Sequence, residues 1–508
     1  MKRFALSFAA LLFVSLSSFA QPENWWEESC TSIMVGRKAT TDGSVITSHT
    51  CDGKYRTWNY MEPAADHQEG EMHQVLKGTL KTHFRGDTTN VRVAGEIPEV
   101  AHTFAYLNTA YPCLNEKQLC IGETTWVGTD VIRNKNGMFL IEELERIALQ
   151  RCSTARDAVI LMGSVAEKYG YGDSGECLTV ADKNEVWQFE ICGAGKDKVG
   201  AVWVAQRIPD DCIAVSANIP RIGKLNRKDK ANFLCSDNVE QVAKDNGLWD
   251  GKGEFSFWKA YIGKGKVKNY SDRELFIFQT LAPSMKFTSD ITELPVYVKP
   301  DAKVDVRQVM ALFRATYEGT ENDMCKNVKN EKGEISPVAN PWLTTTMRNT
   351  LNAIAPGTVE FHRTVAVSWC GYSFVGQLRN WLPDAVGGVV WLSVDNPAQS
   401  PRIPIFCGNT KTPEPFLRCG IWNYWPYCGL WTFRPANKLA TLSWQTTKKE
   451  FNENIEKQLN KAFSGLKILE VNPTAEELND YTQTVFDYSA SMWKAMEAKY
   501  WVEFGNGF

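Results

Sequence analysis

Short apolar and β-branched runs alternate with turn residues along the first half of the chain. The runs 30–36 and 44–50 flank a connection that contains the turn pair Asp42-Gly43. Two such runs around a turn predict a β-hairpin, with Cys30 at the very start of its first strand. Further short strands are expected within residues 97–128.

Helical periodicity follows. Apolar residues recur at helical spacing in 139–151 and 153–169, and Ser153 is the expected N-cap of the second helix. Strands are then predicted in quick succession at 177–181, 185–191, 199–205 and 212–217. Strands, two helices and more strands favour an α+β fold, an antiparallel sheet covered by helices, over a doubly wound fold. No glycine-rich phosphate-binding motif supports nucleotide binding.

Beyond residue 300 the pattern becomes more helical, with helices predicted at 304–317 and 437–466. A last helix follows Asn472-Pro473 and opens with Thr474 and Glu477 in capping-box positions. One face of this helix is expected to hold Leu478, Tyr481, Val485, Tyr488 and Met492. The aromatic segment 422–427 is more typical of core packing, although an exposed cluster could line a sugar or peptide groove.

The N-terminus reads as an export signal, because Lys2 and Arg3 precede an apolar stretch and Ser18-Phe19-Ala20 forms a small-residue cleavage site. The predicted organisation is a signal peptide at 1–20, a short propeptide at 21–29, a core at 30–300 and a helical, aromatic-rich part at 301–508 that packs on or completes the core. No later window predicts a membrane span. The expected location is periplasmic or extracellular.

A net charge of −3 with evenly spread charges gives no case for nucleic-acid or membrane-surface binding. The basic run 221–230 is interpreted as a solvated loop. Fourteen cysteines would allow disulfides in an exported chain. Cys407, Cys419 and Cys428 are spaced widely enough for disulfides that close loops. Without a Cys-x-x-Cys pair, and with six scattered histidines, neither a metal site nor a cofactor is predicted. The sequence leaves open whether the protein forms a homo-oligomer.

Cys30 is the candidate nucleophile. Cleavage of the Ser29–Cys30 bond would give it a free α-amine, whose reference pKa of about 7.7–8 suits a general base. One residue would then supply nucleophile and base. A lipid-modified cysteine is disfavoured, because Trp25-Trp26-Glu27-Glu28-Ser29 is not a small apolar run. A buried or disulfide-bonded structural cysteine stays equally open from spacing alone.

Several linked motifs carry a family resemblance. They occur in order across roughly the first 290 residues: Cys30-Thr-Ser-Ile-Met-Val-Gly, Asp42-Gly43-Ser44, Asp52-Gly53, Leu114-Asn115-Glu116, Gly122-Glu123-Thr124-Thr125, residues 202–210, Ala217-Asn218-Ile219-Pro220 and Tyr270-Ser271-Asp272-Arg273. This series resembles the bacterial dipeptidase D family, which is similar to the secernins and more distantly to bile-salt hydrolases and penicillin V acylases.

The resemblance implies a four-layer αββα N-terminal-nucleophile hydrolase fold and a cysteine dipeptidase acting on a small peptide. It also implies roles for four residues. Cys30 would be the nucleophile and Asp52 would hold its amine. Asn218 would donate to the oxyanion, and Arg273 would favour the thiolate. Thr125 is a candidate for contacting substrate.

His49 is a departure, because many relatives carry an arginine there. The change replaces a permanent charge with a group that titrates near pH 6.5, so pH dependence or substrate choice is expected to differ. Strand alternation places His49 and Cys51 on one face and Asp52 on the other, unless the strand bulges or ends there. Two other functions stay open: an amidase of acylated amino acids, and a noncatalytic binding protein using the 422–431 aromatics.

Overall fold

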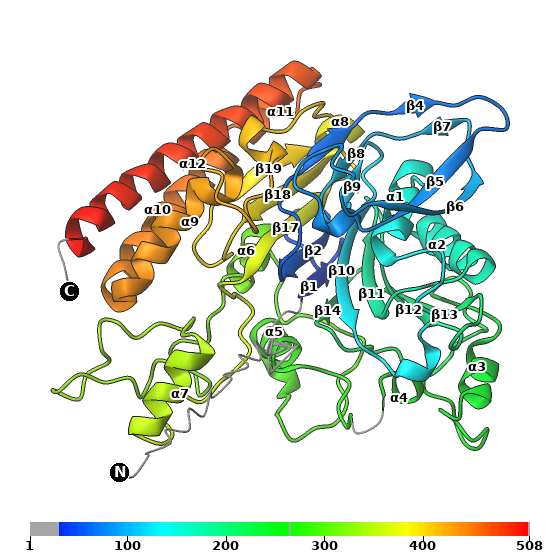
Figure 1. The fold of residues 1–508 in the computed structure, drawn as a ribbon, viewed down its shortest axis with the longest axis horizontal. Helices are drawn as coiled ribbons and strands as arrows, with labels where there is room; N and C mark the ends of the chain where they lie inside the picture. The colour runs from blue at the N-terminus through cyan, green and yellow to red at the C-terminus, as the bar shows by residue number, and fades with distance from the viewer. Residues whose placement is uncertain (1–29, 264–265, 506–508) are drawn as a thin grey trace, which may run out of the picture.

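The computed structural model describes residues 30–263 and 266–505 (Figure 1). The predicted signal peptide and propeptide lie outside the described residues. Within these ranges the chain is a mixture of helices and strands, which confirms the α+β class. Every pair of named strands is antiparallel.

Cys30 lies next to a seven-stranded sheet. Its strands, in spatial order, are β16 (Tyr297–Val298), β14 (Ile213–Ser216), β1 (Ser32–Val35), β2 (Val45–Asp52), β17 (Cys370–Leu378), β18 (Gly388–Val394) and β19 (Ile403–Phe406). Pairing of β1 with β2 confirms the predicted hairpin. Strands β17 to β19 follow residue 300 in sequence and extend this sheet beyond β2.

The second sheet has eight strands. In spatial order these are β15 (Phe233–Cys235), β13 (Ala201–Ile208), β12 (Val186–Gly193), β11 (Gly175–Ala181), β10 (Cys120–Trp126), β9 (Leu114–Asn115), β8 (Tyr106–Asn108) and β3 (Tyr60–Glu62). Two small ribbons pair β4 (Ala65–Asp66) with β7 (His102–Thr103) and β5 (Met72–Lys77) with β6 (Arg92–Pro98).

The two large sheets contact each other through β2, which packs on β10 and β11. Gly122 marks their closest approach, because a Cβ at this position would lie 2.3 Å from the carbonyl oxygen of Ser48. Thr47 Oγ1 also donates to the carbonyl oxygen of Thr179 across the sheets, at 2.9 Å. A residue without a side chain is therefore required at position 122.

Helices α1 (Ile141–Arg151) and α2 (Ala155–Tyr169) form the predicted pair, and α2 packs on β11, β12 and β13. The predicted cap was wrong by one residue. Thr154 Oγ1, not Ser153, accepts the backbone N–H of Asp157 at 3.1 Å. Both residue types cap well, so the sequence could not distinguish the two positions.

The C-terminal helices α9 (Gly429–Ala440), α10 (Trp444–Ser464) and α12 (Ala475–Phe504) lie together, away from α1 and α2 (Figure 1). The prediction of a single helix at 437–466 was wrong, because the chain leaves helical geometry at Ser443, which separates α9 from α10. The capping box of Thr474 and Glu477 is confirmed. The predicted apolar face of α12 is buried at Leu478 and Val485, whereas Tyr488 is exposed.

The other helices are α3 (Val239–Asp245), α4 (Phe257–Tyr261), α5 (Asp272–Leu281), α6 (Val306–Leu312), α7 (Thr345–Ile354), α8 (Asp384–Gly387) and α11 (Leu466–Leu469). Helix α6 is shorter than the predicted 304–317, because its Asp305 capping box starts it and the chain turns at Phe313. Among the described helices none combines the length and apolar character needed to cross a bilayer.

One surface expectation was wrong, and a second holds except at one residue. The 422–427 segment is not core, because Tyr424 and Tyr427 are 70% and 88% exposed. The basic run 221–230 is a loop with exposed lysines, as expected, except that Arg221 is buried and paired with Glu274. The fourteen cysteines, all within the described part of the chain, are free thiols, Cys407, Cys419 and Cys428 included.

Candidate active site

Cys30 lies two residues before β1, and its side chain is buried at 3% exposure. Thr31 extends the hairpin through an isolated bridge to Thr50. Burial raises the pKa of the Cys30 thiol well above its usual value, and Glu123, Cys51 and Asp52 add to the rise. The backbone N–H of Asp52 opposes this effect. The thiol is therefore protonated at neutral pH and requires a base to become a nucleophile.

Asp52 is the last residue of β2 and is fully buried. Its Oδ2 accepts from Thr50 Oγ1 at 2.9 Å and from the Arg363 guanidinium at 2.7 Å. Its Oδ1 is buried without a hydrogen-bond partner among the described residues. This second oxygen is free to accept an additional donor, such as an amine close to Cys30.

The strand pairing explains how Asn218 reaches Cys30. Ser32 pairs with Ser216, so continuing the antiparallel register by two positions sets Asn218 opposite Cys30. Asn218 has a φ of 67°, in the left-handed region that asparagine tolerates. Its Nδ2 donates to the carbonyl oxygen of Thr125 at 2.6 Å. The amide carries a second hydrogen, which can donate to an oxyanion.

Arg273, in the first turn of α5, connects these groups. One guanidinium nitrogen donates to the carbonyl oxygen of Cys30 at 2.6 Å and to Thr31 Oγ1 at 2.9 Å. The other donates to Asn218 Oδ1 at 2.8 Å. Burial lowers the pKa of Arg273 to about 10, so the group stays charged at neutral pH. Arg273 therefore holds the candidate nucleophile and the candidate oxyanion donor in one arrangement.

A buried ion pair supports the Asn218 loop. Glu274 pairs with Arg221, and its Oε1 accepts the backbone N–H of Ala217 at 3.1 Å. Its Oε2 accepts the backbone N–H of Ser271, closing the capping box of α5. One carboxylate thus fixes the start of the helix that carries Arg273 and the loop that carries Asn218.

His49 lies in the same buried region, in the middle of β2. Its Nδ1 lies 2.7 Å from the carbonyl oxygen of Glu123, and its ring centroid lies 5.6 Å from those of Tyr111 and Tyr372. Burial lowers the pKa of His49 to about 4, so the imidazole is neutral. Partner strand β17 is irregular between Cys370 and Tyr372, where β2 ends. The extra residue is in β17, and the hydrogen bond from Thr50 Oγ1 shows that Asp52 keeps the face of Thr50, so the alternation that separates His49 from Asp52 holds.

Glu123, on β10, is a site residue to which the sequence assigned no role. A carboxylate oxygen of Glu123, the Cys30 Sγ and a ring nitrogen of His49 all lie within 4.8 Å of one another. Burial raises the pKa of Glu123 to about 7. Glu176 is opposite Thr125 in the neighbouring strand, and burial together with the nearby Glu123 raises its pKa well above the usual value. Two neighbouring buried carboxyls do not both ionise readily, so the pair near the thiol retains a proton at neutral pH.

Thr125 is half-buried next to these groups. Its Oγ1 donates to Glu123 Oε1 at 3.0 Å, and its carbonyl oxygen holds Asn218. A hollow of about 360 Å³ opens beside Asn218 and is lined by residues 126–130, 219, 262, 263 and 266 as well. The sequence-predicted residues thus come together at one place, and this hollow adjoins it.

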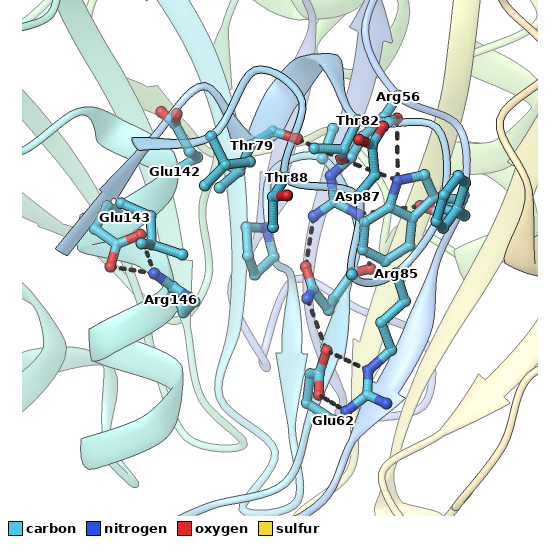
Figure 2. A pocket seen from close by; sticks show the side chains of 18 residues that line it. Arg56, Glu62, Thr79, Thr82, Arg85, Asp87, Thr88, Glu142, Glu143 and Arg146 are labelled. Atoms are coloured by element: carbon cyan, nitrogen blue, oxygen red, sulfur yellow. Dashed lines mark hydrogen bonds and ion pairs between the residues drawn. The ribbon is translucent and has the colours of Figure 1, made fainter. Parts of the chain in front are cut away.

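Another hollow, of about 190 Å³, lies between β3, β5, β8 and α1 (Figure 2). Glu62 pairs there with Arg85, and Glu143 with Arg146, so these charges neutralise each other. Its lining includes none of Cys30, Asp52, Asn218 and Arg273. The candidate chemistry is therefore elsewhere.

Sequence reasoning missed two residues of the site. Arg363 binds Asp52 from 311 positions further along the chain, and no local pattern indicates this contact. Glu123 had a signal, because it stands in the Gly122-Glu-Thr-Thr motif, two residues before Thr125. Residues two apart in a strand share a face, which could have placed Glu123 with Thr125.

Comparisons with known proteins show which family this chain resembles. A curated "Probable dipeptidase" of Latilactobacillus sakei is 27% identical over 394 residues, covering 76% of each chain. A "Probable dipeptidase" of Salmonella dublin is 26% identical over 75% of this chain and 81% of its own. A "Probable dipeptidase B" of Streptococcus pyogenes serotype M1 is 25% identical over 76% and 74%. The model of peptidase family C69 matches residues 29–457, most of the chain, and this protein therefore belongs to peptidase family C69.

Proposed function

We propose that this protein is a cysteine dipeptidase that attacks peptide bonds with Cys30. The observation that carries the proposal is the buried carboxylate of Glu123, one oxygen of which lies within 4.8 Å of the Cys30 sulfur. Family membership and the names of the relatives support a peptidase. The Glu123 carboxylate supports a substrate with a free amino group.

The distances fit such a substrate. A sulfur about to attack lies about 3–3.5 Å from the carbonyl carbon. In an N-terminal residue the α-nitrogen is two bonds from that carbon, about 2.5 Å away. A carboxylate that binds an ammonium group through a hydrogen bond of about 2.8 Å can therefore lie 4–5 Å from the sulfur. Glu123 Oε2, buried with no hydrogen-bond partner among the described residues, is the acceptor for this group.

The mechanism is acyl transfer. The freed α-amine of Cys30, held by Asp52 Oδ1, takes the thiol proton as the sulfur attacks the scissile carbonyl. Asn218 Nδ2 donates to the oxyanion of the tetrahedral intermediate. The amine returns the proton to the leaving nitrogen as the C–N bond breaks, and water then hydrolyses the thioester. The leaving residue occupies the hollow beside Asn218.

This mechanism requires cleavage before Cys30, and we also propose that the chain is exported and that residues 1–29 are removed. Intact-mass measurement of the active protein is expected to show a chain that begins at Cys30. An active sample that begins at Gln21 contradicts the terminal-amine mechanism.

The arrangement of sheets and helices supports the four-layer αββα fold as part of the same proposal. Helix α2 packs on the eight-stranded sheet, α9 and α12 pack on strands of the seven-stranded sheet, and the two sheets meet through β2.

The test compares matched peptides. A dipeptide with a free amine is expected to be cleaved, whereas its N-acetylated form is cleaved poorly. Glu123→Gln removes a charged hydrogen bond of about 1.5–3 kcal/mol, so kcat/KM for the free dipeptide should fall about 10- to 100-fold. The kcat/KM for the N-acetylated peptide should fall little in Glu123→Gln. The control variant is Glu96→Gln, at an exposed position. Cleavage restricted to N-acylated substrates contradicts the proposal and favours the amidase.

A further inference from the structure

Three potential metal ligands surround the same point: the Cys30 sulfur, a His49 ring nitrogen and a Glu123 carboxylate oxygen, all within 4.8 Å of one another. Their side chains are 3%, 0% and 0% exposed. His49 Nε2 and Glu123 Oε2 are both buried and have no hydrogen-bond partner among the described residues. Buried polar atoms are rarely left unpaired, so this pair indicates a ligand.

The orientation of His49 suits coordination. Its Nδ1 lies 2.7 Å from the carbonyl oxygen of Glu123 and 3.3 Å from the Glu123 backbone nitrogen, and the shorter contact favours the tautomer with the proton on Nδ1. The lone pair is then on Nε2. Histidines that bind metals usually donate their other ring N–H to a carbonyl or carboxylate in this way. Contacts with Tyr111, Tyr372 and Phe374 hold the ring in place.

The donor set of thiolate, imidazole and carboxylate is one that Zn²⁺ accepts. Tetrahedral ligands of Zn²⁺ lie about 3.3–3.8 Å apart, so the three atoms need to approach by about 1 Å. Side-chain rotation supplies such a movement. A water molecule can take the fourth position.

We propose that Cys30, His49 and Glu123 form a binding site for a divalent ion of the Zn²⁺ class, and that its occupation blocks the enzyme. The Cys30 thiol releases its proton to solvent and a metal–sulfur bond forms, without a change of oxidation state. The ion occupies the position of the substrate ammonium and removes the sulfur from attack. Only this inhibitory consequence depends on the proposed function.

The direct test is Co²⁺ binding to the full chain, followed by absorption spectroscopy. A thiolate-to-cobalt charge-transfer band at one equivalent is expected, and Cys30→Ser should abolish it. His49→Gln and Glu123→Gln should each weaken Zn²⁺ binding at least tenfold, measured by competition with a chromogenic chelator. Two matched controls are Cys235→Ser and His102→Gln, which lie outside the cluster and should keep both signals. Near-ultraviolet circular dichroism verifies that each variant is folded.

Two results overturn the site: a cobalt complex without a thiolate band, or Zn²⁺ affinity that is unchanged by His49→Gln. In the activity assay, Zn²⁺ should raise KM for a dipeptide more than it lowers kcat, and a chelator should restore the rate. Equal inhibition of the wild type and a folded, active His49→Gln variant also contradicts the site. Because cobalt binding is read without turnover, an inactive enzyme that binds cobalt refutes only the proposed function.

Discussion

Single residues of the site depend on buried polar contacts that connect distant parts of the chain. Asp52 and Arg363 are the clearest case, with side chains 0% and 9% exposed and 2.7 Å between their charged atoms. A buried ion pair contributes little by itself, but the loss of one partner leaves an uncompensated charge. The position of Asp52, and through it the environment of Cys30, therefore depends on Arg363.

Arg363→Met is expected to lower the free energy of unfolding by about 3–5 kcal/mol, because the Asp52 carboxylate loses its charged partner in the interior. Urea denaturation measures the change. The control is Arg85→Met, which breaks the more exposed pair with Glu62 and should cost at most about 1 kcal/mol. Equal losses in the two variants would show that Arg363 does not compensate Asp52. Adding Asp52→Asn to Arg363→Met should recover part of the loss.

At the scale of elements, the sequence predicted helices and strands correctly where residues in the chain itself mark their ends. Thr474 and Glu477 predicted the first turn of α12, since a capping box satisfies backbone donors within four residues. The break between α9 and α10 was not predicted, because Ser443 has no strong helix-breaking character. The prediction of the β1–β2 hairpin was correct. Its neighbours in the sheet, β14 and β17, come from far along the chain, so no local pattern indicates them.

The contact between the two sheets makes a prediction about β10. Gly122→Ala places a methyl group against the Ser48 carbonyl, where the backbone leaves no room. Overpacking of this kind typically costs about 1–3 kcal/mol. The variant should therefore unfold at lower urea concentration, with reduced peptidase activity because β2 carries Asp52. Gly223→Ala is the matched control: its Cβ would lie 3.4 Å from the nearest atom. A Gly122→Ala variant as stable as the control contradicts the close packing.

The whole molecule buries several carboxyl groups. Burial raises the pKa of Glu142 to about 8, with help from Asp173, and raises that of Glu190 to about 7. Both Glu142 oxygens are buried and have no hydrogen-bond partner among the described residues. A raised pKa means that the folded state binds the proton more tightly than the unfolded chain does. This contribution to stability is complete below about pH 4.5 and disappears as the pH rises through about 8 for Glu142.

Glu142→Gln is expected to flatten this pH dependence, since an amide resembles the protonated acid and cannot ionise. The variant should gain stability relative to the wild type, by roughly 4 kcal/mol, as the pH rises from 5 to 8.5, because about three pKa units are worth about 1.4 kcal/mol each. Urea denaturation at several pH values provides the measurement, and the exposed Glu476→Gln should leave the slope unchanged. If the unfolding free energy of Glu142→Gln keeps the wild-type slope against pH, other groups take up the proton.

The sequence by itself determined the α+β class, the hairpin next to Cys30, the helix pair α1–α2 and the order of motifs that led to the family. These features depend on residues close together, where periodicity and caps act locally. Only the tertiary structure decided that Glu123, His49 and Cys30 share one point, that Arg363 pairs with Asp52, and that Tyr424 and Tyr427 face outward. Such contacts follow from strand order and sheet packing, which bring together residues that no local pattern relates.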